Sequence, residues 1–145
     1  MTTLDDVLAL GSRDHFLATV ATGRADGSIQ ASLVNAGVML HPLSDERVAA
    51  FVTYGPVKLA NLRARPTIAV TWRASWEWVT VEGRATLIGP NDPAPGIDAE
   101  RLRLLLREIF QAAGGTHGDW DDYDRTMVEQ GRTAVFVSPD RVYSN

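Results

Sequence analysis

Apolar and polar residues alternate with the two-residue period of β-strands along much of the chain. This pattern is regular over residues 28–34 and continues at residues 38–40. Together with other stretches rich in β-branched residues it predicts six strands, over residues 16–22, 28–40, 48–53, 67–72, 76–88 and 133–138, with residues 142–143 as an extension. Asp26-Gly27 predicts a hairpin turn, and Gly83 predicts a bulge in the fifth strand.

Four segments follow the helical period instead, over residues 3–10, 57–65, 99–113 and 119–130. Thr2 or Thr3, Asp98 and Asp119 are expected as N-caps, and Gly11 is expected to end the first helix. Strands and helices do not alternate regularly, so a βαβ fold is disfavoured. We therefore expect a mainly β, α+β chain, with one closed or nearly closed antiparallel barrel over residues 1–145.

Composition narrows the classes of function. The chain is 45% hydrophobic and 22% charged, with a net charge of −4 and no basic run, which argues against a nucleic-acid partner. No cysteine is present, and the three histidines lack metal-ligand spacing, so no metal site is expected. No apolar run approaches the roughly 20 residues of a membrane span. The first residues lack the form of a signal peptide, which predicts a cytoplasmic protein.

The clearest candidate for ligand chemistry is the junction of the third strand and second helix. A helix start presents free N–H groups and a partial positive charge, which together can bind phosphate. Lys58 lies in the first turn of this helix, where a cation disfavours the helix but would favour a bound anion. The alternative interpretation is a lysine on the surface of a surface helix.

Two further groups admit a functional and a structural interpretation. Gln30, Ser32 and Asn35 lie on the polar side of a strand, where they could contact a coenzyme or simply face solvent. The tryptophans Trp72, Trp76 and Trp78 could pack a coenzyme ring or a dimer contact, or belong to the core. We expect Trp76 and Trp78 to point to the same side of their strand.

The order and spacing of several segments resemble the pyridoxamine-phosphate-oxidase-like split β-barrels, and within them the actinobacterial branch that uses the deazaflavin coenzyme F-420. The resemblance spans nearly the whole chain and rests on FLATV (16–20) with Asp26-Gly27, QAS (30–32) and Val34; KLANLRARP (58–66); WEWVTVEGRATL (76–87); and HGDWDDY (117–123) with Met127-Val128 and Val142-Tyr143.

The resemblance implies a six-stranded, FMN-binding type of split barrel that forms a homodimer, with two coenzyme sites built jointly by both subunits. The family's phosphate-binding lysine corresponds to Lys58, and Trp76 to an aromatic residue supplied by the other subunit. The other expected coenzyme contacts fall on the second strand and on both sides of the lysine, at Gln30, Ser32, Val34, Asn35, Thr53, Pro56, Val57 and Asn61, with Leu62 and Arg63 following.

The sequence departs from the family at Pro56, because many members carry an arginine there. One phosphate contact is therefore lost or replaced, and N–H groups of Thr53 or Gly55 could compensate. The implied activity is an oxidoreductase that transfers hydride from the coenzyme to a small organic acceptor. No catalytic side chain is assigned, since the coenzyme carries this chemistry. The alternatives are an FMN-dependent enzyme of the same fold, including pyridoxamine-phosphate oxidation, and a coenzyme- or haem-binding protein without turnover.

Overall fold

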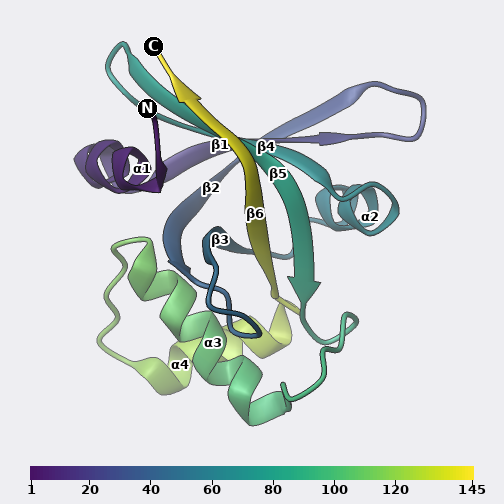
Figure 1. Cartoon of the computed structure of the whole chain (residues 1–145). Helices are drawn as coiled ribbons and strands as arrows, with labels where there is room; N and C mark the ends of the chain where they lie inside the picture. The colour runs from purple at the N-terminus through teal and green to yellow at the C-terminus, as the bar shows by residue number, and fades with distance from the viewer.

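Six antiparallel strands close into a barrel in the order β1-β2-β3-β6-β5-β4, and β4 pairs in turn with β1 (Figure 1). The computed structural model describes all residues from 1 to 145. The six-stranded antiparallel barrel with helices confirms the expected fold class. The strands are β1 (Leu17–Gly23), β2 (Ile29–Leu40), β3 (Arg47–Thr53), β4 (Thr67–Ala74), β5 (Glu77–Ile88) and β6 (Thr133–Ser144).

Four α-helices and one 3-10 turn decorate the barrel, close to the expected positions. Thr3, Asp98 and Asp119 each accept a backbone hydrogen bond as N-caps, as expected from their short polar side chains. No helix combines the length and apolar character needed to cross a membrane. The helical elements are α1 (Leu4–Gly11), η1 (Ser12–Asp14), α2 (Pro56–Ala64), α3 (Ala99–Ala112) and α4 (Trp120–Glu129).

Two hydrophobic cores hold these elements together. The larger cluster lies inside the barrel and under α1, and includes Phe51 and Trp72. The smaller cluster joins α3 and α4 to the outer faces of β3 and β6, through residues such as Leu105, Ile109 and Phe136. β3 is consequently buried on both faces from Val48 to Phe51, whereas β1 and β4 are buried mainly at alternate residues. The second core fixes α3 and α4 together at one end of the barrel (Figure 1).

The first helix ends at Gly11, as predicted, although Gly11 does not adopt the left-handed conformation of a terminating glycine. Gly11 is the last residue of α1, has a right-handed φ of −58° and leads directly into η1. A Cβ at this position would lie 2.7 Å from Phe16 Cδ1, so the position requires glycine for packing rather than for a turn. The chain reverses instead at His15 and Phe16, whose φ values are 56° and 54°. The first strand therefore begins at Leu17, one residue later than predicted.

The three tryptophans of the central sequence lie in three different environments. Trp72 is fully buried, and its Nε1–H donates to the carbonyl oxygen of Ala36 over 2.8 Å. Trp76 lies with Ser75 in the two-residue turn between β4 and β5, so the prediction that it shares a strand face with Trp78 was wrong. The side chain of Trp76 is 90% exposed, whereas Trp78 packs edge-on against Tyr143. Only Trp72 is a plain core residue.

The bulge predicted at Gly83 is confirmed. The pairing of β5 with β6 shifts register between Glu82 and Gly83. A Cβ on Gly83 would lie 2.0 Å from the carbonyl oxygen of Ser138, so only glycine allows the two strands to approach this closely. Such a bulge increases the bend that a small barrel needs to close.

Candidate functional site

A cavity of about 650 Å³ opens between the start of α2, the strands β2 and β3, and the helices α3 and α4. We call it the α2 cavity. Its size is within the range of small-molecule and coenzyme sites. One side is polar and comes from the β3–α2 junction, whereas the opposite side is mainly apolar and comes from α3 and α4. It is lined by Leu33, Val34, Asn35, Val52, Thr53, Tyr54, Gly55, Pro56, Lys58, Ile109, Phe110, Ala113, Tyr123, Met127 and Arg132.

The end of β3 shapes the polar side of this cavity. Gly55 is the N-cap residue of α2, and Pro56 occupies the first turn, where its missing N–H costs nothing. The hydroxyl oxygen of Thr53 accepts hydrogen bonds from the Gly55 N–H and from Lys58 Nζ, both over 3.3 Å. The Gly55 N–H is therefore already engaged and does not offer the compensating phosphate contact that we expected from it. The N–H groups of Val57 and Lys58 remain as the first-turn donors.

Lys58 is the only lysine in the chain, and it is 5% exposed. Its ammonium lies 5.8 Å from the centre of the Phe51 ring and forms no ion pair. Burial lowers the pKa of this ammonium, and the nearby positive charge of Arg132 lowers it further. A surface lysine is thus excluded, since Lys58 is a buried cation with no acidic partner. Such a group is costly to the fold unless a ligand neutralises it.

Arg132, which sequence reasoning missed, also lines the α2 cavity. It lies in the short connection between α4 and β6, and its guanidinium stacks over the Tyr54 ring at 4.1 Å. Burial lowers its pKa as well. No motif marks this residue in the sequence, because its approach to Tyr54 depends on the pairing of Thr53 with Thr133 in the barrel.

Tyr123, also absent from the predicted set, is buried at the α4 side of the cavity. Its hydroxyl donates to the carbonyl oxygen of Leu106 over 3.0 Å, and burial raises its pKa to about 12. This hydroxyl is therefore occupied and strongly disfavours ionisation. Tyr123 supports the packing of α4 on α3 and is a poor proton donor for chemistry at neutral pH.

The structure brings about half of the predicted site residues to the α2 cavity. Val34, Asn35, Thr53, Pro56 and Lys58 line it, although the Asn35 amide also donates to the His15 carbonyl over 2.8 Å. The remaining residues lie outside the lining and are Gln30, Ser32, Val57, Asn61 and Trp76.

Asn61 has a structural role in this chain. It is 6% exposed, and its Nδ2–H donates to Thr22 Oγ1 over 3.0 Å, which ties α2 to β1. The Thr22 hydroxyl in turn donates to Gln30 Oε1 over 3.3 Å. The Thr22 hydroxyl therefore links the side chains of Asn61 and Gln30 in one chain of hydrogen bonds.

The polar side of β2 faces inward rather than toward solvent. Ser32 and Val34 are half-buried, whereas the intervening apolar residues Ile29 and Leu33 are 68% and 63% exposed. The Ser32 hydroxyl oxygen is buried without a hydrogen-bond partner, the only such side-chain atom in the structure. A buried polar atom without a partner is rare in folded proteins. It lies on the same face of β2 as Val34, but Ser32 itself does not line the cavity.

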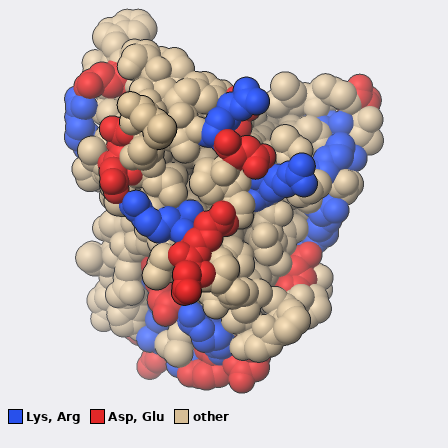
Figure 2. All heavy atoms as spheres, in the orientation of Figure 1, with Lys and Arg blue, Asp and Glu red and all other residues tan.

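These features fit a phosphorylated, partly aromatic ligand better than a metal ion. No group of three or more His, Cys, Asp or Glu side chains is arranged to hold a metal. The cavity offers two cations, a helix start and an unpaired hydroxyl nearby, opposite an apolar side that would exclude water. On the face shown in Figure 2, acidic and basic side chains are interspersed.

Comparisons with known proteins point to one family. A family model described as "Pyridoxamine 5'-phosphate oxidase" matches residues 4–144. Solved structures with similar folds include a conserved hypothetical protein from Mycobacterium tuberculosis, with a TM-score of 0.68 and 15% identity over 99% of this chain and 84% of that chain. A protein named F420 reductase has a TM-score of 0.63 and 14% sequence identity, over 99% of this chain and 98% of that chain. A pyridoxamine 5'-phosphate oxidase-related, FMN-binding protein from Nostoc punctiforme has a TM-score of 0.64 and 14% sequence identity, over 97% of this chain and 80% of that chain.

Proposed function

The chain belongs to the pyridoxamine 5'-phosphate oxidase family, and on that premise we propose that it is an oxidoreductase that binds coenzyme F-420 in the α2 cavity, with FMN as the alternative. The proposed reaction is hydride transfer to a small organic acceptor. Two similar structures, one named F420 reductase and one FMN-binding, support this pair of candidates.

The observation that carries the proposal is the buried ammonium of Lys58. At 5% exposure it lies at a helix start without an acidic partner, and the adjacent Thr53 hydroxyl contributes only a weak 3.3 Å contact. Desolvating a cation without a partner destabilises the fold, so retention of this lysine is best explained by an anionic ligand. Lys58 and the first-turn N–H groups of α2 would hold the phosphate of either coenzyme.

The other cavity residues would bind and shield the coenzyme. The β2 residues Val34 and Asn35, which line the cavity, would lie along it. The apolar residues Ile109 and Phe110 would exclude water from the opposite side. A bound flavin or deazaflavin supplies the hydride-transfer chemistry itself. Because the Tyr123 hydroxyl is engaged with Leu106, the proton that accompanies the hydride would come from solvent.

We further propose that two copies of the chain form a homodimer. The outward face of β2 exposes Ile29 and Leu33, and Val57 in the first turn of α2 is 48% exposed. A contiguous exposed apolar patch can mark an interface, and Ile29 and Leu33 lie on one face of β2. Trp76, which is 90% exposed at the tip of the β4–β5 hairpin, would reach the coenzyme of the partner subunit.

Fluorescence titration of the purified protein with coenzyme F-420 and with FMN, side by side, tests this function. We expect Lys58→Ala to weaken binding by about 1.5–3 kcal/mol, the range for a hydrogen bond to a charged group. Arg141→Ala, which removes an exposed cation outside the cavity, serves as the control. Unchanged affinity in Lys58→Ala would contradict the phosphate assignment. Oxidation of the reduced coenzyme by enones, quinones or tetrapyrroles would separate an enzyme from a binding protein.

A further inference from the structure

Arg132 lines the α2 cavity and has hydrogen-bonding capacity that the chain does not use. Its Nε–H donates to Gln130 Oε1 over 2.8 Å, and Tyr54 covers one face of the guanidinium at 4.1 Å. The terminal Nη1 and Nη2 groups form no hydrogen bond or ion pair within the chain. Stacking and the contact with Gln130 thus hold the guanidinium in place while leaving its bidentate end free. This end matches the oxygen pairs of phosphate and carboxylate groups.

Arg132 and Lys58 lie at the same end of the cavity. The final rungs of the β3–β6 ladder pair Thr53 with Thr133, which places Arg132 next to Tyr54. Lys58 reaches back from α2 to the hydroxyl of the same Thr53. The charge on Arg132 is felt by Lys58, whose pKa it lowers. Two cations from segments far apart in the sequence therefore line one cavity near the end of the β3–β6 ladder.

The cavity contains nothing that neutralises this pair. None of its lining residues is aspartate or glutamate. Elsewhere in the chain, partly buried arginines such as Arg103 and Arg107 pair with Asp124. Two adjacent cations repel each other and lose hydration on burial, so the arrangement favours a ligand that brings concentrated negative charge to both.

We infer that Arg132 is a second anion-binding residue of the α2 cavity, and that a single phosphate group of the ligand contacts both Lys58 and Arg132. The inference rests on the proposed function and deepens it, since it specifies a phosphorylated ligand gripped from two sides. Phosphate oxygens can accept from the Lys58 ammonium, from the Arg132 fork and from the α2 N–H groups at the same time. Arg132 acts as a binding and positioning residue, without a chemical step of its own.

The test compares FMN with riboflavin, which has the same ring but no phosphate. In Arg132→Gln we expect FMN affinity to fall about 10- to 100-fold, the loss for a hydrogen bond to a charged group, while riboflavin affinity stays as in the parent. Arg132→Lys should recover part of the FMN affinity, because the charge returns without the planar fork. The matched control is Arg125→Gln on the surface of α4, where Arg125 pairs with Asp122 outside the cavity.

A second readout needs no coenzyme. Lys58 is the only lysine, so lysine labelled with ¹³C and ¹⁵N gives one side-chain NMR signal from this residue. We expect Arg132→Gln to raise the pKa of Lys58, because it removes a nearby positive charge. Inorganic phosphate should also raise this pKa in the parent and less so in Arg132→Gln. Thermal unfolding of each variant confirms that it is folded.

The outcomes separate this inference from the proposed function. If Lys58→Ala loses FMN but Arg132→Gln binds FMN like the parent, Arg132 is not a phosphate ligand and the proposed function stands. If Arg132→Gln weakens FMN and riboflavin equally, Arg132 supports the ring or the fold, and the inference is also overturned. If the parent binds neither coenzyme, the proposed function fails. A phosphate-induced shift of the Lys58 signal that depends on Arg132 would then still support the two-cation site.

Discussion

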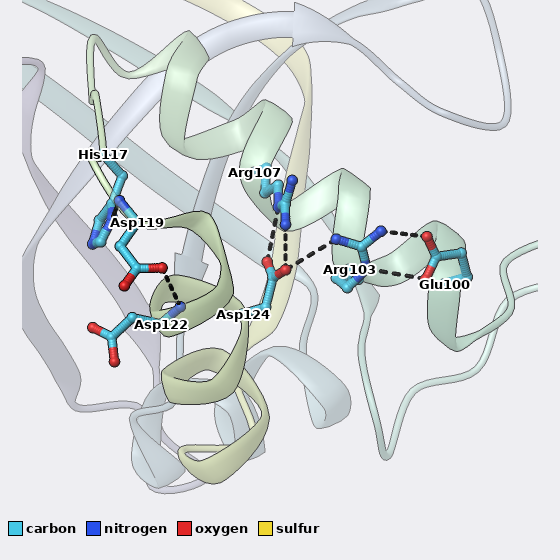
Figure 3. Close-up of polar contacts among 7 residues, drawn as sticks. All are labelled: Glu100, Arg103, Arg107, His117, Asp119, Asp122 and Asp124. Atoms are coloured by element: carbon cyan, nitrogen blue, oxygen red, sulfur yellow. Dashed lines mark hydrogen bonds and ion pairs between the residues drawn. The ribbon is translucent and has the colours of Figure 1, made fainter.

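The charges on the α3–α4 surface and those in the α2 cavity are arranged in opposite ways. On α3 and α4, Asp124 accepts hydrogen bonds from both Arg103 and Arg107, and Arg103 also pairs with Glu100 (Figure 3). In the α2 cavity, Lys58 and Arg132 have no acidic partner at all. The first group of charges is balanced within the fold, whereas the second has no balancing charge in the cavity lining and, on our proposal, is balanced by a bound anion.

This difference separates charges that the folded state favours from charges that it disfavours. Hydrogen bonds from Arg107 are the main cause of the lowered pKa of Asp124, so the folded state favours its charged form. Burial lowers the pKa of Lys58, so the folded state disfavours its charged form. Sites of the second kind are where proteins sacrifice stability for binding. Three variants, one of them also measured as a function of pH, would break or sharpen this contrast.

Introducing an acid into the cavity should have the largest effect. Met127 lines the cavity from α4, and in Met127→Glu the new carboxylate would pair with Arg132 or Lys58 and repel the phosphate. We expect the affinity for F-420 or FMN to fall at least about 100-fold, since misplaced like charges cost several kcal/mol. Fluorescence titration measures the loss, and Met127→Gln is the uncharged control. Equal affinity in the two variants would mean that the anion binds elsewhere.

Removing the buried ammonium should stabilise the protein. At neutral pH, Lys58→Met relieves an unpaired cation that is 5% exposed, and we expect a gain of about 1 kcal/mol, or roughly 2–4 °C in Tm. The folded-state pKa lies below the ordinary 10.5, so the destabilisation is full below the folded pKa and fades as the pH rises through it. The gain should therefore shrink at alkaline pH in calorimetry. A destabilised Lys58→Met would show that the ammonium supports the fold.

Removing the carboxylate of Asp124, which pairs with both Arg103 and Arg107, should lower the stability of the protein slightly, whereas Lys58→Met should raise it. We expect Asp124→Asn to lower Tm by a few degrees, roughly 1–3 °C, because the pairs are partly exposed to solvent. Coenzyme affinity should not change, since Asp124 lies outside the α2 cavity. Asp121→Asn on the same helix removes an exposed carboxylate and is the control. A loss of affinity in Asp124→Asn would couple the two regions.

The smallest expected effect is the pH dependence of the Tm difference between the parent and Asp124→Asn. The pKa of Asp124 is lowered in the folded state, so its stabilisation is full above the ordinary value of 3.8 and disappears as the pH falls through the lowered pKa. The gap in Tm between the parent and Asp124→Asn should be present at neutral pH and close in acid below 3.8. Thermal unfolding at several pH values checks this. A gap that persists in acid would point to packing rather than charge.

Local sequence signals predicted most elements but failed where distant residues meet. The helix caps at Thr3, Asp98 and Asp119 and the bulge at Gly83 follow from local chemistry and were predicted. The end of the first helix at Gly11 was predicted as well, but the close contact of Gly11 with Phe16 was not, because it depends on how the chain packs after the helix.

In the candidate site, too, residues that belong to one continuous segment were predicted, whereas residues from distant segments were not. Lys58 and Thr53 belong to one continuous segment, so the strand-to-helix junction revealed them both. Asn61 was expected at the coenzyme because of the resemblance, yet its amide bonds to Thr22 across the α2–β1 contact. Tyr123 and Arg132 come from the C-terminal part of the chain and have no motif that links them to Lys58.

The amino-acid sequence alone determined the strands, the helices and the place where an anion could meet a helix start, because periodicity, caps and turns act over a few residues. Only the tertiary structure decided that Lys58 is buried, that the polar side of β2 faces inward, and that no acid neutralises the cavity. Closure of the barrel is the physical reason. It pairs Thr53 with Thr133 and so brings Arg132, which lies far after Lys58 in the sequence, into the lining of the same cavity.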